Sequence, residues 1–408
     1  MAEPSPAESS SLLSGPKKNK WFRESDFSDG LGAGPGAGSP RRRRWFWFIM
    51  VFASFVFLAG LALSLAAPQQ RRQASGPVIG SNFQDPSVVQ LADGSYVAYA
   101  GVNGNPAGSN VLIATSPDFS TWTVRYGYDA LPNLPSWAAS PPHVWAPDVT
   151  QLVSSLSVAL SDPWLADTGQ NNGNFVLYYS VVMAESPSKH CVAAAYAPNA
   201  EGPFTPVQTP LFCDLGAGGA IDADGFNDPT TNRQYVVYKV DGNSVGNGGA
   251  CSNTVAPIAP TPLNLQEVSN DDGYTALGGT STILLNDPDD GPNIEAPSLT
   301  YDASSGTYIL FYSSKCFTQA PYNIRYATST SIYGPFTKQP NPFLVTGSTA
   351  ANLYIPGGID VTKDGKKAVF HGDTNMGWFA GDGSKRVRAM YALDLNFAGG
   401  AVHPGGLY

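Results

Sequence analysis

Thr307-Tyr-Ile-Leu-Phe-Tyr-Ser313, followed by Tyr326-Ala-Thr-Ser-Thr-Ser-Ile-Tyr-Gly-Pro-Phe336-Thr, contains the pattern that decides the fold. Its first part is rich in β-branched and aromatic residues, which is typical of a β-strand. Its second part is similar to Ile113-Ala-Thr-Ser-Pro-Asp-Phe-Ser-Thr-Trp122-Thr and, more loosely, to Ala195-Tyr-Ala-Pro-Asn-Ala-Glu-Gly-Pro-Phe204-Thr. A segment that recurs in this way indicates a repeated β unit.

Strand-like runs of the same kind occur along the chain from residue 78 onward. Gly, Pro and Asp-Gly pairs separate them, and the 43 Gly and 34 Pro of the chain favour many turns over long helices. Asp93-Gly94 and Asp364-Gly365 each stand immediately before such a run, as hairpin turns do. The runs are 95–100, 174–180, 234–239, 307–313 and 367–371. We therefore expect an all-β domain.

Short motifs recur in step with these runs, at intervals of about 60 to 75 residues. In chain order the motifs are Asp85-Pro86, Pro147-Asp148, Asp222, Glu295-Ala-Pro297 and Pro356-Gly357. Five units of this size fill residues 78–408, and propellers have roughly four to eight blades of four strands each. The sequence therefore predicts a five-bladed β-propeller over residues 78–408, in which the first strand of each blade lines a central channel.

Three acidic residues of these motifs stand among apolar or small residues: Asp85 in Asn-Phe-Gln-Asp-Pro, Asp222 in Gly-Ala-Ile-Asp-Ala, and Glu295 in Asn-Ile-Glu-Ala-Pro. Charged residues make up only 13% of the chain, so this placement is unlike that of ordinary surface acids. Carboxyl groups in such surroundings tend to have shifted pKa values. Because the blade positions are expected to converge on the channel, the three acids should meet in one pocket, which suits acid/base cleavage of a glycosidic bond.

The order and spacing of the motifs resemble glycoside hydrolase family 43, whose members are five-bladed propeller enzymes acting on polysaccharides that contain arabinose and xylose. The resemblance spans roughly residues 78 to 400 and rests on Asp85-Pro86, Trp145-Ala-Pro-Asp148, Ile221-Asp222 and Glu295-Ala-Pro297. It implies that Asp85 is the general base, that Glu295 is the general acid, and that Asp222 orients Glu295 and tunes its pKa. It also implies inversion at the anomeric carbon, for which the two carboxyl groups should lie about 6.5–9.5 Å apart.

The fifth unit departs from the family pattern. The family has Pro-Gly-His there, followed by a strand that ends in a second His, whereas this chain has Pro356-Gly357-Gly358-Ile359-Asp360 and only His371 matches. In many members the missing His helps to hold a calcium ion or a water at the channel centre. We therefore expect no metal and no other cofactor, with a central calcium as the alternative.

Four further residues are candidates for contact with the sugar. Trp145 offers an aromatic face on which a sugar ring could stack, and His371 is expected to point into the channel. Arg325 and Lys239 are predicted to lie on strands near the mouth of the pocket, where they could hydrogen-bond to sugar hydroxyl groups. The alternative is a core or structural role for Trp145 and His371 and a solvated surface position for Arg325 and Lys239. Asp148 is interpreted as a turn or support residue.

Several function classes do not fit the chain. It has four His residues and no His-Glu-x-x-His spacing, so a metallohydrolase is not expected. It has no Gly-x-Ser-x-Gly motif, which argues against an esterase. Its formal net charge of −9 and pI near 4.9 disfavour binding to nucleic acid, whose phosphates require a basic face.

Four cysteines allow three disulfide pairings. Cys191–Cys213 and Cys251–Cys316 are favoured, because each pair then joins neighbouring segments. Buried free thiols are the alternative.

The N-terminal part of the chain is expected to lie outside the propeller. Residues 1–44 are rich in Ser, Pro, Gly and basic residues and are predicted to be a disordered cytoplasmic tail. Residues 45–67 form an uncharged apolar run long enough for a transmembrane signal-anchor, and the four arginines before it favour a cytoplasmic N-terminus. Residues 68–77 would be a linker to an extracellular or lumenal domain. The alternative is a cleaved signal peptide and a secreted protein.

Two alternative functions are open besides an arabinose- or xylose-releasing hydrolase. One is a membrane-tethered propeller that binds a polysaccharide or oligosaccharide without cleaving it, which the altered fifth unit would allow. The other is a fructan-active propeller hydrolase with a retaining mechanism. The fructan-cleaving relatives use Arg-Asp-Pro and Glu-Cys motifs, and neither motif occurs in this chain.

Overall fold

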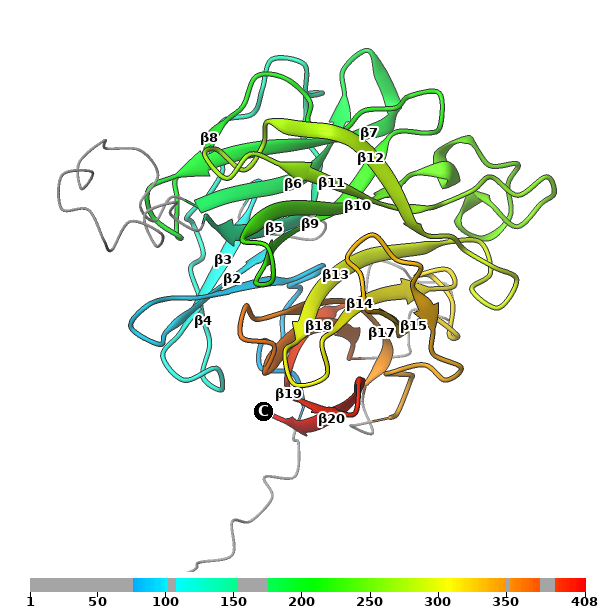
Figure 1. Cartoon of the computed structure of the whole chain (residues 1–408). Helices are drawn as coiled ribbons and strands as arrows, with labels where there is room; N and C mark the ends of the chain where they lie inside the picture. The colour runs from blue at the N-terminus through cyan, green and yellow to red at the C-terminus, as the bar shows by residue number, and fades with distance from the viewer. Residues whose placement is uncertain (1–75, 102–107, 153–174, 349–352, 375–385) are drawn as a thin grey trace, which may run out of the picture. The chain divides into compact units, whose positions relative to one another are not determined.

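The described part of the chain folds into five four-stranded antiparallel sheets, each built from four consecutive strands (Figure 1). The structure is a computed structural model, and it describes residues 76–101, 108–152, 175–348, 353–374 and 386–408. Each sheet is one blade, and the first strand of each blade lies innermost. The prediction of an all-β, five-bladed propeller is confirmed.

The strands follow the chain in order from blade one to blade five. Blade one contains β1 (Ser87–Gln90), β2 (Tyr96–Ala100), β3 (Leu112–Ser116) and β4 (Thr123–Val124). Blade two contains β5 (Val144–Gln151), β6 (Phe175–Met183), β7 (Ser186–Ala197) and β8 (Thr205–Pro206). Blade three contains β9 (Ala220–Asp228), β10 (Arg233–Val240), β11 (Leu263–Val268) and β12 (Ala276–Leu284).

The last two blades have the same plan. Blade four contains β13 (Ile294–Asp302), β14 (Thr307–Ser314), β15 (Asn323–Ser329) and β16 (Thr337–Lys338). Blade five contains β17 (Tyr354–Val361), β18 (Lys367–Asp373), β19 (Arg388–Ala398) and β20 (Ala401–Leu407). Two short 3₁₀ helices, η2 (Gly242–Val245) and η3 (Ala250–Ser252), stand in the connection between β10 and β11.

The sequence signals correspond to defined strands of each blade. The strand-like runs are the second strands β2, β6, β10, β14 and β18. The recurring Ala-Thr-Ser segments are the third strands β3 and β15, and the looser copy is the end of β7. The second strands are buried on both faces by the neighbouring blades, so they read as continuous apolar runs.

The hydrophobic core is divided into five clusters, one between each pair of adjacent blades. The cluster between blades one and two contains Tyr99 and Leu177, and the cluster between blades five and one contains Phe83 and Met390. The remaining three clusters join blades two and three, three and four, and four and five. Burying a side chain of this size stabilises the fold by about 1.5–3 kcal/mol. Each blade therefore depends on both of its neighbours.

The ring is closed by backbone hydrogen bonds between the two ends of the domain. Ile79 and Met390 exchange two backbone hydrogen bonds of 3.2 and 3.1 Å. Ile79 thus pairs with the start of β19, whereas β20 pairs with the later part of that strand. The amide of Phe83 donates to the carbonyl of Arg388 at 2.8 Å. This closure brings Arg388 beside the start of blade one.

Both favoured disulfides are present and confirm that prediction. Cys191 on β7 pairs with Cys213 within blade two. Cys251 pairs with Cys316, which ties the β10–β11 connection of blade three to the β14–β15 connection of blade four. The second disulfide therefore fixes the position of Phe317, the next residue along the chain.

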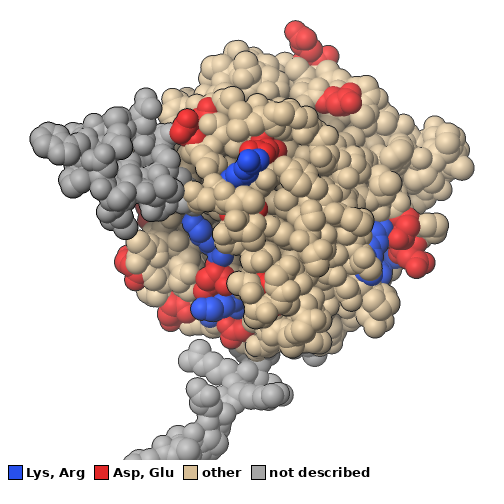
Figure 2. All heavy atoms as spheres, in the orientation of Figure 1, with Lys and Arg blue, Asp and Glu red and all other residues tan. Residues whose placement is uncertain are grey.

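Charged side chains are sparse on the face seen in Figure 2, and its basic residues lie scattered, with acidic residues beside several of them. The predicted tail 1–44 and membrane segment 45–67 lie outside the described residues, as does the linker 68–77 apart from its last two positions. Within the described ranges, no helix has the length and apolar character needed to cross a bilayer.

Candidate active site

The five inner strands share an unusual backbone position. At one equivalent position each inner segment has a residue with a positive φ, between 42° and 56°: Asp85, Ala146, Asp222, Ala296 and Gly358. The inner strand of blade five has a second such residue, Ile355, with φ 41°. The pairing register with the second strand shifts at this position in blades two to five, which marks a bulge. The bulge turns the local chain so that the side chains here face the channel. Residues with such uncommon backbone angles are often found at functional sites.

The three predicted acids line one pocket at this end of the channel, but they do not share one blade position. Asp85 and Asp222 are the positive-φ residues of blades one and three. Glu295 stands one residue earlier in blade four, at the position that Trp145 holds in blade two. The expectation of a single shared position is therefore wrong by one residue for Glu295. The pocket is lined by Asp85, Trp145, Ile221, Asp222, Glu295, Ala296, Phe317, Tyr322 and Arg388.

Asp85 is surrounded by basic groups of blade five. Arg388 Nη1 lies 3.3 Å from Asp85 Oδ1, and His371 Nδ1 lies 3.2 Å from the same oxygen. Burial works to raise the pKa of Asp85, but the Arg388 charge and the His371 contact outweigh it and lower that pKa below its usual range. Asp85 is therefore ionised at neutral pH.

Glu295 is held by two donors, one on each carboxylate oxygen. Lys239 Nζ donates to Oε2 at 3.0 Å, and the Tyr322 hydroxyl donates to Oε1 at 2.8 Å. Lys239 is only 2% exposed and also lies 3.6 Å from Asp241 Oδ1. The Glu295 carboxyl group is thus fixed in one orientation toward the pocket.

Asp222 is coupled to Glu295 through both backbone and charge. Its Oδ2 accepts a hydrogen bond of 3.0 Å from the amide of Ala296, the residue that follows Glu295. Burial and the neighbouring Glu295 charge raise the pKa of Asp222 to about 7, against the opposing effect of Lys239. Asp222 therefore retains a proton close to neutral pH, whereas Asp85 does not. One side of the pocket can give a proton and the other can accept one.

Of the four predicted sugar contacts, Trp145 lines the pocket, and His371 lies against one of its acids. Trp145 lines the pocket and stacks on His190 with ring centroids 3.7 Å apart. His371 is 1% exposed and contacts Asp85 from β18, so it supports an acid. Its Nε2 atom has no hydrogen-bond partner among the described residues.

The other two predicted contacts have different surroundings from those expected. Arg325 on β15 donates to the carbonyls of Gln339 and Pro340 and does not line the pocket. These bonds hold the Arg325 side chain against the outer part of blade four. Lys239 is in the site, but its ammonium group is buried against Glu295 and Asp241. Lys239 therefore acts on Glu295, and its predicted contact with sugar hydroxyls is replaced by this ion pair.

Sequence reasoning missed three residues of the pocket, Tyr322, Arg388 and Phe317. Arg388 is 303 residues from Asp85 and reaches it only because the ring closes. Tyr322 and Phe317 belong to the β14–β15 connection, which the Cys251–Cys316 disulfide tethers. The guanidinium groups of Arg386 and Arg388 lie 5.4 and 5.7 Å from the centre of the Phe317 ring. The one signal for these residues in the sequence was the basic cluster from Lys385 to Arg388, which stands out in an acidic chain.

The calcium ion that the family resemblance implies does not fit the fifth blade in its usual form. The family places a His where this chain has Gly358, and that His contributes to the ion's site. A Cβ atom added to Gly358 would lie 2.9 Å from His371 Nδ1. His371 therefore fills the space that a side chain at this position needs, and no step is assigned to a His-bound ion there.

The chain is similar in sequence to a known enzyme family. The family model described as "Glycosyl hydrolases family 43" matches residues 74–391. No curated protein matches the chain.

Solved structures of similar fold include three glycoside hydrolases. A thermostable family-43 glycoside hydrolase is 23% identical with a TM-score of 0.61, and the alignment covers 82% of this chain and 96% of that one. An endo-1,4-beta-xylanase from Bacteroides thetaiotaomicron is 23% identical, with a TM-score of 0.56 and coverage of 81% and 97%. A native arabinanase from Bacillus subtilis is 19% identical, with a TM-score of 0.53 and coverage of 80% and 99%. At these identities the likeness is evidence for the fold.

Proposed function

Because the chain belongs to glycosyl hydrolase family 43, we propose that it is an inverting glycosidase that cleaves polysaccharides or oligosaccharides containing arabinose or xylose. One observation carries this proposal. Asp85, Asp222 and Glu295 enter one pocket from three different blades, and their surroundings lower the pKa of Asp85 but raise that of Asp222. The proposal of a substrate that contains pentose units is supported by the names of two similar structures, an endo-xylanase and an arabinanase.

In the proposed reaction, Asp85 is the general base and Glu295 the general acid. A water between Asp85 and the anomeric carbon loses a proton to Asp85 while its oxygen forms the new bond to that carbon. The bond from the anomeric carbon to the leaving oxygen breaks, and Glu295 gives this oxygen its proton. Attack from the side opposite to the leaving group inverts the configuration.

Lys239 and Tyr322 assist at the moment when Glu295 loses its proton. The carboxyl group becomes an anion as the leaving oxygen is protonated. Lys239 Nζ and the Tyr322 hydroxyl already point at its two oxygens, so the developing charge meets donors that need not reorient. Asp222 is a positioning residue in this scheme, because it binds the backbone of Ala296, next to Glu295.

The aromatic walls of the pocket suit a sugar ring. Trp145 and Phe317 line it, and the first is braced by His190 while the second is braced by Arg386 and Arg388. Aromatic faces favour the C–H groups of sugars, and rigid ones lose little entropy on binding. We also propose, on the sequence alone, that residues 45–67 anchor the protein so that this pocket faces the outside of the cell or a lumen.

A hydrolysis screen tests the proposal. The full-length protein is incubated with arabinan, arabinoxylan, xylan and nitrophenyl pentosides, with nitrophenyl hexosides as the comparison. We expect release of reducing sugar or nitrophenol from at least one pentoside and about tenfold less from every hexoside, since one added hydroxymethyl group strains a closed pocket. Binding of a polysaccharide without any hydrolysis would contradict the proposal and favour a sugar-binding propeller.

A further inference from the structure

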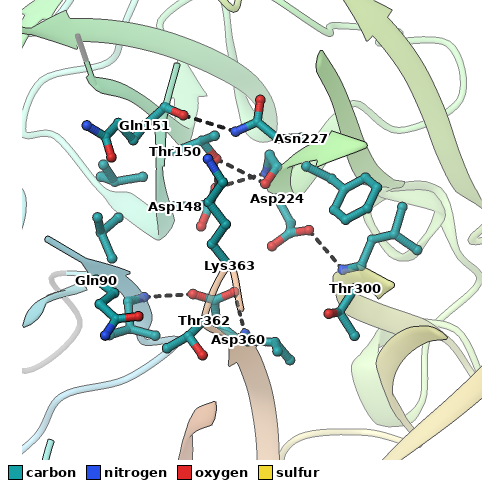
Figure 3. A pocket seen from close by; sticks show the side chains of 17 residues that line it. Gln90, Asp148, Thr150, Gln151, Asp224, Asn227, Thr300, Asp360, Thr362 and Lys363 are labelled. Carbon is teal, nitrogen blue, oxygen red and sulfur yellow. Dashed lines mark hydrogen bonds between the residues drawn. The ribbon is translucent and has the colours of Figure 1, made fainter. Parts of the chain in front are cut away.

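A second set of inner-strand residues lies deeper in the channel than the pocket. Two positions after the positive-φ residue, the five blades present Ser87, Asp148, Asp224, Ser298 and Asp360. All five are buried. The three aspartates offer carboxylate oxygens that lie within 4.8 Å of one another, and Figure 3 shows them in one cavity. No role in the proposed hydrolysis uses them.

Each of the three aspartates is oriented by a backbone amide of the next blade. Asp148 Oδ2 accepts from the Gly225 amide at 2.9 Å, and Asp224 Oδ2 accepts from the Leu299 amide at 3.0 Å. Asp360 Oδ2 accepts from the Val88 amide at 2.7 Å. These bonds hold one oxygen of each carboxyl group in place. Asp148 also accepts a hydrogen bond from the backbone of Val149, and the carboxyl groups of Asp224 and Asp360 are hydrogen-bonded to each other.

The charges of the cluster are not balanced by the protein. Among the described residues, no Lys, Arg or His forms an ion pair with Asp148, Asp224 or Asp360. Lys363 lines the outer part of the same cavity, but its side chain is exposed. Asp148, Asp224 and Asp360 are all buried, with exposed fractions of 7%, 7% and 8%. Three adjacent carboxyl groups in such a place must hold protons or a cation.

A buried hydroxyl group gives independent evidence of a ligand. Ser87 is 3% exposed, and its Oγ atom has no hydrogen-bond partner among the described residues. The residue lines the same section of the channel as the three aspartates. Ser298 holds the equivalent position in blade four, and its Oγ donates to Asp360 Oδ1 at 3.1 Å, so side chains at this position reach the cluster. A buried hydroxyl without a partner is unfavourable, which indicates that Ser87 Oγ binds something in the channel.

We propose that Asp148, Asp224 and Asp360 bind one divalent cation in the channel, with Ser87 Oγ as a further ligand and water completing the shell. All donors are oxygen atoms, which select a hard cation over zinc or copper. Two ligands of one Ca²⁺ ion can lie at most twice the Ca–O distance apart, about 4.6–5.2 Å. The spacing of the three carboxylates meets this limit. Calcium is the best fit, because it accepts irregular oxygen shells whereas magnesium demands an octahedral one.

This site differs from the one that the family resemblance implies. The family position is Gly358, at the pocket end of β17, whereas Asp360 lies two residues deeper on the same strand. The ion would link the inner strands of blades two, three and five. These strands belong to three different sheets, so no strand pairing connects them. Its expected role is to hold the ring together beneath the pocket. The site does not depend on the proposed hydrolase activity.

Calcium binding is tested on the full-length protein after removal of metal with EDTA and dialysis. We expect titration calorimetry to show one bound Ca²⁺ per chain, with magnesium at least about tenfold weaker. A ligand that binds only the folded state raises the unfolding temperature, so saturating Ca²⁺ should raise the thermal midpoint by about 5 °C. A wild-type protein that binds no Ca²⁺ at millimolar concentration and shows no change in midpoint would overturn the proposal.

Substitutions locate the site. In EDTA, Asp224→Asn and Asp360→Asn should fold and unfold at the same or a higher temperature than wild type, because each removes one of three neighbouring carboxyl groups. Both should lose the Ca²⁺-dependent increase, whereas a purely structural role predicts destabilisation in EDTA. Asp302→Asn is the matched control: this buried turn acid bonds Ser304 and Ser305 and should keep the full Ca²⁺ response.

Two further variants keep all three carboxylates and so keep the proposal testable if an Asn variant does not fold. Ser87→Ala should weaken Ca²⁺ binding by roughly fivefold to tenfold, through loss of one neutral ligand. Lys363→Met should strengthen it, through loss of a nearby positive charge. Unchanged Ca²⁺ affinity in both variants, or an unchanged response in Asp224→Asn, would place any bound ion elsewhere.

Discussion

Glu295→Gln is expected to lower the turnover of a natural polysaccharide by roughly 100- to 10,000-fold, because an amide cannot donate the proton that the leaving oxygen needs. The fold should survive, since Gln keeps the size of Glu and can still accept the hydrogen bond of Tyr322. Turnover is measured as reducing sugar released per enzyme at saturating substrate, beside the thermal midpoint of each variant.

The leaving group supplies the control for this prediction. A nitrophenyl pentoside releases a stable anion that needs little protonation, so Glu295→Gln should lose much less activity on it than on the polysaccharide. The matched variant Glu267→Gln changes an acid on β11 that pairs with Arg233, far along blade three, and should have wild-type turnover. Equal losses on both substrates, or near-normal turnover on the polysaccharide, would show that Glu295 is not the acid.

Asp85→Asn is expected to lower turnover by a similar factor, roughly 100- to 10,000-fold, on both classes of substrate. The carboxylate is the group that removes the proton from water, and the leaving group does not change this need. The substitution also removes the negative charge that Arg388 and His371 hold in place. Initial rates on a nitrophenyl pentoside and on polysaccharide are compared with those of Asp93→Asn, an exposed turn residue that should be unaffected.

A small anion provides a further outcome for Asp85→Asn. Azide is a nucleophile that needs no base to remove a proton. In the variant, Arg388 keeps its positive charge beside the position of the lost carboxylate, so it can attract the azide anion. Added azide should therefore restore part of the rate on the nitrophenyl pentoside and give a glycosyl azide of inverted configuration. A glycosyl azide of retained configuration would mean that the nucleophile enters from the other face and that Asp85 has another role.

The fold was predictable because the second strands of the blades are buried on both faces. Their apolar runs and the repeated Ala-Thr-Ser segments are local signals, and both correspond to defined strands. The inner strands were harder to align, because the bulge inserts a residue in the region of the motifs. The resulting error was one residue for Glu295, which neighbours the positive-φ Ala296 and does not occupy that position itself.

The surroundings of the acids were less predictable, since they come from distant parts of the chain. Lys239 was expected near the pocket, and the partner that buries it, Glu295, is 56 residues away in the next blade. Arg325 was misplaced because its guanidinium group donates to the carbonyls of Gln339 and Pro340, a direction that no local signal in the sequence indicates. Asp148 was interpreted as a turn or support residue, and only the ring geometry brings it beside Asp224 and Asp360.

The anomeric configuration of the first product is the most direct test of the account's central claim, that Asp85 and Glu295 act from opposite sides of one pocket. Proton NMR during the first minutes of hydrolysis, before the sugar equilibrates between anomers, resolves the two forms. The account predicts a product of configuration opposite to that of the cleaved bond. A product that first appears with the same configuration as the substrate would contradict it, because that result requires a covalent intermediate or attack from the other face.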